Sequence, residues 1–163
     1  MTDYGIREGS RADIAGMIRV FRRSIRESAS ADYVADQITA WARRGTEERF
    51  LKLFEDGLRF WVAENRMHEV IGYSAVKADG YLHSLFVRPD FQRQGIAGKL
   101  LQKAFEYCAV AEAEQIFVEA SITALPFFFQ AGFNIEKSQD VCVDGIFLRN
   151  HVMSLQLTAL HKK

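Results

Sequence analysis

The segment from Leu85 to Lys99 combines residue types that could bind an anion. A β-prone stretch ends at Pro89, a polar turn follows, and Gly95 opens a stretch with helical periodicity. The first turn of a helix presents backbone N–H groups that have no intrahelical acceptor, and the helix dipole adds positive potential there. Small residues at positions 95, 97 and 98 leave room for a ligand to approach this backbone. The segment therefore predicts a site for a phosphate-bearing ligand.

The spacing of this segment does not fit two better-known phosphate loops. Gly98-Lys99 is followed by leucine and lacks the upstream glycine of a Walker loop, and no glycine triplet matches the dinucleotide fingerprint. The sequence therefore disfavours a nucleotide triphosphatase.

Composition and charge narrow the function classes further. The 163 residues, 48% of them hydrophobic, are enough for one globular domain spanning residues 1–163 and too few for two. The 21 basic and 21 acidic side chains balance, so the positive patch expected of a nucleic-acid-binding protein is not indicated. No leader pattern and no run of roughly 20 apolar residues is present, so a cytoplasmic protein without a membrane partner is expected. Cys108 and Cys142 are expected to be reduced, buried thiols, and no metal site is predicted.

Hydrophobic periodicity predicts helices in the first third of the chain and a sheet in the remainder. A strand is expected first, then a capping box formed by Ser10 and Asp13, and three amphipathic helices, the second following Ser30 with Val34 in its apolar stripe. The expected strands are 4–8, 58–64, 70–76, 81–88, 115–120, 133–143 and 146–157, and the later helices are 95–113 and 123–131.

Two motifs resemble those of the GNAT superfamily of N-acetyltransferases. Gln92, Gly95 and Ala97 are similar to the family's acetyl-CoA loop, and the preceding Leu85–Pro89 is similar to its fourth strand. The second motif is matched, one helix and one strand later, by Ser121, Ala124, Phe127, Phe128, Gly132 and Phe133. The resemblance covers nearly the whole chain.

This resemblance implies an α/β (α+β) fold, a mixed, mainly antiparallel sheet of six or seven strands that is flanked by helices and splayed where acetyl-CoA enters. Acetyl-CoA is the implied co-substrate, and no metal is required. Backbone groups of residues 85–87 are expected to bind the pantetheine arm, and residues 92–99 the pyrophosphate. The implied cofactor-binding residues are Leu85, Phe86, Val87, Gln92, Arg93, Gln94, Gly95, Ile96, Ala97, Gly98, Lys99, Ser121, Phe127 and Phe128.

Transfer to an amine requires a base, because an alkylammonium group has no lone pair. The stretch Leu82–Val87 is similar to the serotonin acetyltransferase branch of the family, in which the histidine at the position of His83 is implicated in proton removal. Strand alternation places His83 on the face of Leu85, either toward the acceptor pocket or away from it. A half-buried histidine that only fills the sheet face is the alternative. Glu64, at the end of a neighbouring strand, is the second candidate base, or else a surface charge.

The chain departs from the family at the position of the tyrosine that protonates the departing thiolate, because Phe128 stands there. Water or the hydroxyl of Ser121 could protonate the thiolate, or the thiolate could leave unaided. The expected function is transfer of acetyl from acetyl-CoA to a primary amine of a small molecule, by direct attack in a ternary complex. Acetylation of a protein lysine or N-terminus and a non-catalytic acyl-CoA sensor are the alternatives. A homodimer is one option for the assembly.

Overall fold

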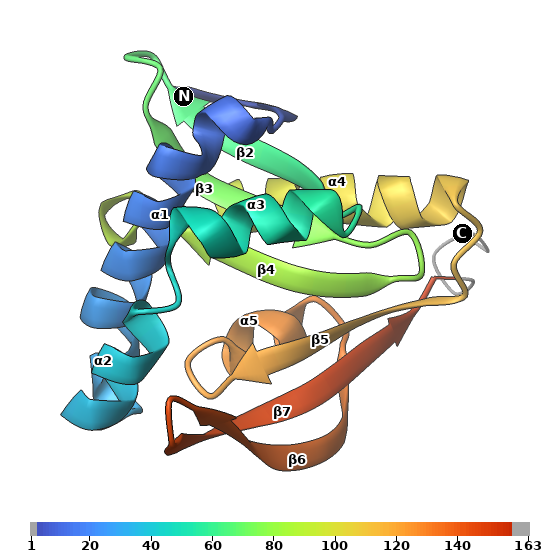
Figure 1. Ribbon diagram of the computed structural model, residues 1–163. Coiled ribbons are helices and arrows are strands. Elements are labelled where there is room, and N and C mark those ends of the chain that lie inside the picture. The colour runs from blue at the N-terminus through green and yellow to red at the C-terminus, as the bar shows by residue number, and fades with distance from the viewer. Residues whose placement is uncertain (1–2, 158–163) are drawn as a thin grey trace.

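The computed structural model describes residues 3–157 and contains one open sheet of seven strands (Figure 1). The strand order is β1-β2-β3-β4-β5-β7-β6, and each neighbouring pair is antiparallel except β4 and β5, which are parallel. This confirms the mixed, mainly antiparallel sheet. The strands are β1 (Tyr4–Glu8), β2 (Arg59–Asn65), β3 (Val70–Val76), β4 (Tyr81–Val87), β5 (Gln115–Ser121), β6 (Asn134–Val143) and β7 (Ile146–Gln156).

Helices cover both faces of this sheet (Figure 1). On one face, α1 and α3 pack against β2 and β3 through a core that includes Phe60 and Tyr73. On the other face, α4 packs against β3 and β4 through Ile71 and Leu100. The helices are α1 (Ile14–Arg23), α2 (Ala35–Ala42), α3 (Glu47–Glu55), α4 (Ile96–Val110) and α5 (Leu125–Gln130), and a π-helical turn, η2 (Ser24–Ser28), continues α1.

Most of the expected elements form because local signals and tertiary packing agree. The capping box of Ser10 and Asp13 is present before α1, and the side chain of Thr46 caps α3 by accepting a hydrogen bond from the N–H of Arg49. Gly72 lies under α4, where an added Cβ would come within 3.2 Å of Ile96. This glycine therefore allows α4 to approach the sheet closely.

The start of one helix and the burial of one cysteine differ from the expectation. The second helix begins at Ala35 and not after Ser30, because the backbone of Val34 is extended and its side chain is 66% exposed. Tyr33 takes the buried place beside it. Cys108 is buried as expected, but Cys142 is exposed.

None of the helices within residues 3–157 is long and apolar enough to cross a membrane.

The turn before β4 lies directly against the start of β5, and Gly80 is the residue at this contact. Its φ is +105°, and an added Cβ would lie 2.0 Å from the carbonyl oxygen of Gln115. The N–H of Phe117 donates to the carbonyl oxygen of Gly80 at 3.0 Å. The parallel β4–β5 pairing is therefore anchored at a point where only glycine fits.

We expect Gly80→Ala to lower the free energy of unfolding more than Gly57→Ala does. Both glycines have positive φ, +105° and +86°, so both variants lose about 1–2 kcal/mol to the left-handed backbone. Nothing lies within 4 Å of an added Cβ at Gly57, whereas at Gly80 the overlap is with backbone. The free energy of unfolding should therefore fall by at least about 2 kcal/mol more in Gly80→Ala than in Gly57→Ala. Denaturant titration measures both, and equal losses would contradict the anchoring role.

Candidate active site

A cleft opens where β4 and β5 separate. The two strands pair only at Tyr81–Phe117 and Leu82–Val118, while β5 stays paired with β7 as far as Ser121. The cleft has a volume of about 810 Å³ and is lined from β4, β5, η2, the first turn of α4 and α5. This volume lies within the range of small-molecule sites, roughly 300–1,000 Å³. The splayed sheet expected from the sequence is present.

The edge of β4 that faces this cleft carries backbone groups available to a ligand. The N–H of Arg88 donates to the carbonyl oxygen of Ile71 on β3 at 2.8 Å. Because antiparallel pairing alternates along a strand, Phe86 also turns its backbone groups toward β3, whereas Leu85 and Val87 turn theirs toward the cleft. The carbonyl oxygen of Val87 accepts a hydrogen bond from Ser24 Oγ at 3.0 Å.

The N-terminus of α4 borders the same cleft. Gly95 caps the helix with φ +82°, and the first intrahelical bond runs from the N–H of Lys99 to its carbonyl oxygen at 3.1 Å. The N–H groups of Ile96, Ala97 and Gly98 therefore have no intrahelical acceptor. An added Cβ at Gly98 would meet nothing within 4 Å. This end of the cleft fits a phosphate group.

The structure brings twelve of the fourteen proposed cofactor residues to the cleft lining: Leu85, Phe86, Val87, Gln92, Arg93, Gly95, Ile96, Ala97, Gly98, Ser121, Phe127 and Phe128. The other two, Gln94 and Lys99, are not among the lining residues and contact β1 instead. Tyr4 OH donates to the carbonyl oxygen of Gln94 at 3.1 Å, and Lys99 Nζ lies 5.1 Å from the centre of the Tyr4 ring. These two residues attach the loop to the sheet.

His83 lies at a β-bulge that changes the face on which its side chain stands. Ser84 pairs with Ala75 and Leu82 with Val76, so His83 is one extra residue in β4. Leu82 and Leu85 both pack on the α4 side, which the interruption of alternation allows. The expectation that His83 shares a face with Leu85 is therefore wrong.

The side chain of His83 faces the α3 side and is held there by Ser84. His83 Nδ1 and Ser84 Oγ are 2.7 Å apart, and His83 lines both the cleft and a second hollow formed by α3 and the α2–α3 turn. Burial, with the charges of Arg44 and Lys77 adding to it, lowers the pKa of His83 to about 4. The imidazole is therefore neutral at physiological pH.

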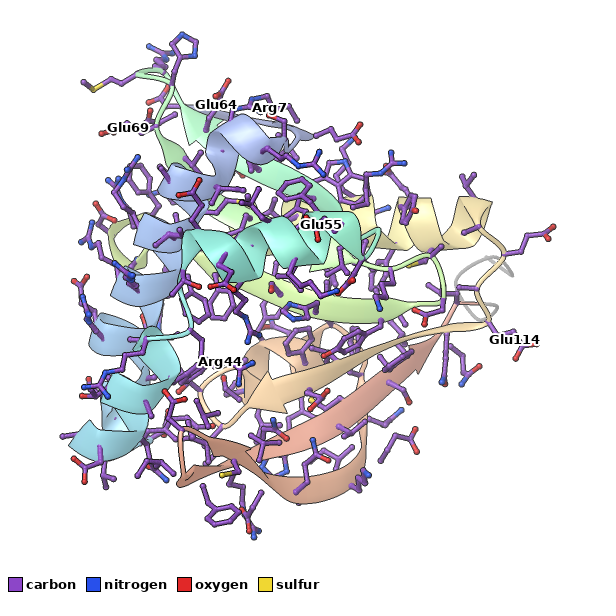
Figure 2. All side chains as sticks on the ribbon, viewed as in Figure 1. Arg7, Arg44, Glu55, Glu64, Glu69 and Glu114 are labelled. Atoms are coloured by element: carbon purple, nitrogen blue, oxygen red, sulfur yellow. The ribbon has the colours of Figure 1, made fainter. Side chains whose placement is uncertain are left out.

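Glu64 lies away from this cleft, near the start of α1 (Figure 2). Arg7 Nη2 approaches Glu64 Oε2 at 3.1 Å and Asp13 Oδ1 at 2.7 Å. The hydrogen bond from Arg7 holds the pKa of Glu64 below its usual range. Glu64 is thus part of an ion-pair cluster that joins β1, β2 and the capping box, and only His83 of the two candidate bases borders the cleft.

The residues of α5 meet the cleft mainly as packing groups. Phe128 is 3% exposed, and its ring centre lies 5.0 Å from that of Phe133. Ser121 Oγ accepts a hydrogen bond from the N–H of Ala124 at 3.2 Å, which stabilises the turn before α5. The described lining residues include no tyrosine.

Sequence reasoning missed the residues that η2 and α2 contribute. Ser24, Glu27, Ser28 and Trp41 line the cleft, and Gln92 Nε2 donates to Ser28 Oγ at 3.2 Å. A π-helical turn is a frequent feature of functional sites, but no residue pattern in this stretch indicated one. Trp41, on α2, is half-buried at the cleft wall.

Tyr33 fixes α2, and with it Trp41, against the C-terminal half of the sheet. Tyr33 OH donates to the carbonyl oxygen of Arg149 at 2.7 Å and accepts from the N–H of Ile122 at 2.9 Å. The ring centres of Tyr33 and Trp41 are 5.4 Å apart in an edge-on arrangement. This side of the cleft is thereby closed by a helix that is hydrogen-bonded to β7.

Among residues 3–157, no group of three or more His, Cys, Asp or Glu side chains is placed to hold a metal ion.

Comparison with known proteins agrees with this geometry. A family model described as an acetyltransferase (GNAT) domain matches residues 29–155. YafP of Escherichia coli K12, named an uncharacterized N-acetyltransferase, is 31% identical over 153 residues, which cover 94% of this chain and 96% of that protein.

Solved structures share the fold. A GCN5-related N-acetyltransferase from Rhodopseudomonas palustris superposes with a TM-score of 0.88 at 24% identity, covering 96% of this chain and 97% of that one. The PaiA N-acetyltransferase of Thermoplasma acidophilum, solved in complex with coenzyme A, superposes with a TM-score of 0.78 at 18% identity, covering 96% and 99%. The family match, the curated relative and the splayed sheet agree, and the chain belongs to the GNAT family of N-acetyltransferases.

Proposed function

We propose that this chain transfers the acetyl group of acetyl-CoA to a primary amine of a small molecule, by direct attack while both substrates are bound. The observation that carries the proposal is the cleft between β4 and β5, because it joins the unpaired N–H groups of α4 to the neutral imidazole of His83. One end suits a phosphate-bearing ligand and the other suits proton transfer. A cytoplasmic location, a single domain and a homodimer stay predictions.

The chain's own residues account for binding of the cofactor. Acetyl-CoA, when bound, supplies a thioester carbonyl that accepts a nucleophile. The N–H groups of Ile96, Ala97 and Gly98 hold the pyrophosphate, and the backbone groups of Leu85 and Val87 bind the pantetheine arm as an added strand would. The N–H groups on this strand also stabilise negative charge that develops on the carbonyl oxygen. Coenzyme A in the Thermoplasma protein of the same fold supports this assignment.

His83 accepts the proton of the attacking amine. When Nδ1–H donates to Ser84 Oγ, Nε2 keeps its lone pair for this purpose. An imidazole with a pKa of about 4 cannot deprotonate a free alkylammonium, whose pKa is about 10.4. The amine therefore enters neutral, and its proton becomes acidic enough for His83 only as the nitrogen bonds to the carbonyl carbon.

The departing thiolate receives its proton from water or from Ser121. Phe128 cannot donate a proton, and Ser121 lines the cleft. A thiolate is a modest base, with an ordinary thiol pKa of about 8.5, so a weak donor is sufficient. Phe128 also favours the second candidate function, an acyl-CoA sensor without turnover.

The proposal is tested by calorimetric titration with acetyl-CoA, with coenzyme A and ATP as comparison ligands, followed by a thiol-release assay with a panel of amines. Micromolar binding of acetyl-CoA with weak binding of ATP, and thiol release that depends on an amine, are expected. Binding without release for any amine would favour the sensor. No binding of either coenzyme A species would overturn the proposal.

We expect Gly98→Glu to weaken acetyl-CoA binding by at least about tenfold, because it places a carboxylate beside the N–H groups that hold the pyrophosphate. Gly98 has no positive φ and lies in open space, so the variant should fold normally. Gln102→Glu, on an exposed position of the same helix, makes the same charge change away from the cleft and is the control. Calorimetry measures the affinity, and equal affinities for the two variants would contradict the placement of the pyrophosphate.

We expect His83→Gln to lower kcat by about a hundredfold while acetyl-CoA affinity changes little, because the residue acts on the amine. The active form of His83 is the neutral imidazole, and with a pKa of about 4 it stays neutral throughout the range of about pH 6 to 9. Any rise of kcat/KM with pH in this range should therefore follow the ionisation of the amine and persist in the variant. An acidic limb near the ordinary histidine pKa that disappears in His83→Gln would show that His83 titrates as an exposed group.

A further inference from the structure

Arg44, in the turn between α2 and α3, carries a charge that nothing in the described part of the chain neutralises. Its Nε is buried and has no hydrogen-bond partner, and its guanidinium forms no ion pair within residues 3–157. By contrast, Arg7, Arg23 and Arg149 each approach a carboxylate. A buried unpaired guanidinium atom is costly, so its retention calls for a partner.

The place of Arg44 points to a bound substrate as that partner. Arg44 and His83 line the same hollow on the α3 side, and the charge of Arg44 is one cause of the low pKa of His83. Figure 2 shows Arg44 extending from the α2–α3 turn toward β4 and β5. The guanidinium is therefore close to the point where the acceptor amine must meet the cleft.

The other charges of the hollow distinguish between kinds of acceptor. It is lined from α3 by three carboxylates, none of them within ion-pair distance of Arg44, and by the cation Arg49; the carboxylates are those of Glu47, Glu48 and Glu55. Lys52 also lines it, and its ammonium is paired with Asp56 at 2.9 Å. A polycation would meet the acidic side chains but leave Arg44 repelled and unpaired, whereas a molecule with both an amine and an anion satisfies both.

We propose that Arg44 binds the carboxylate of the acceptor, and that the acceptor is an α-amino acid. This inference rests on the proposed function. In an α-amino acid the amine and the carboxylate are attached to one carbon, so binding of the carboxylate by Arg44 brings the amine to the neighbouring His83. Arginine is suited to this role because its planar fork binds a carboxylate through two parallel hydrogen bonds.

The experiment compares pairs of substrates that differ only in the carboxylate: phenylalanine with phenethylamine and leucine with isoamylamine, with spermidine as a polyamine. For the wild-type protein we expect kcat/KM to be about ten- to a hundredfold higher for the amino acid of each pair. Arg44→Met should remove this preference by lowering kcat/KM for the amino acids alone. Arg43→Met changes the charge equally at an exposed neighbouring residue and should leave the preference unchanged.

Two further measurements separate recognition from a structural role. Arg44→Lys should restore part of the preference, and the pKa of His83, followed by NMR titration, should rise in Arg44→Met but not in Arg43→Met. Acetyl-CoA affinity should be equal in all variants. A wild-type preference for the bare amines or for spermidine, or an equal loss for both members of each pair in Arg44→Met, would overturn the proposal.

Calorimetric titration of amino acids into the protein with coenzyme A present keeps this inference separate from the proposed function. Binding that Arg44→Met abolishes supports the role of Arg44 even if no thiol is released. Normal coenzyme A binding without amino-acid binding overturns the inference and leaves the acetyl-CoA assignment intact. Loss of coenzyme A binding itself would overturn both.

Discussion

The structure depends on the strand pair β4 and β5, which is hydrogen-bonded at one end and separates toward the other end. β4 and β5 are joined at Tyr81–Phe117 and Leu82–Val118, and beyond these pairs no hydrogen bonds of the ladder hold them together. Gly80 makes this junction possible, because the carbonyl oxygen of Gln115 occupies the space where any other residue would place its Cβ. The strands cannot slide past this point, so their divergence has a fixed origin. The edge that β4 presents to the cleft is a direct consequence.

The electrostatics of the site follow from burial more than from pairing. His83 is neutral because it is removed from water and lies near the positive charge of Arg44. In its proposed role as a base, His83 accepts a proton only after the amine nitrogen has begun to bond to the carbonyl carbon. The buried Nε of Arg44 lacks a hydrogen-bond partner on the same side of β4, so the proposed proton transfer and the proposed substrate recognition depend on one region.

The N-terminal helices and the C-terminal strands meet at one side of the cleft. Tyr33 connects α2 to β7 and to the loop after β5 through two hydrogen bonds, and Trp41 stands on the helix fixed in this way. The ion pairs of Arg7 with Asp13 and Glu64 hold the opposite end of the sheet against the start of α1. Glu64 thus contributes to the framework and lies away from the cleft between β4 and β5.

The sequence by itself determined those features that depend on residues close together along the chain. The proline stop, Gly95 as the left-handed cap and the small residues of the first turn of α4 predicted the anion site, and periodicity located nearly every strand and helix. The family resemblance predicted the splayed sheet in which the cleft lies. Two features could not be predicted from neighbouring residues: the sheet face on which the His83 side chain stands, and the lack of a hydrogen-bond partner for Arg44 Nε. A bulge arises when two strands pair out of step, and a buried guanidinium nitrogen stays without a partner only where the fold brings no acceptor within reach. Both depend on residues distant in the chain, so only the tertiary structure decided them.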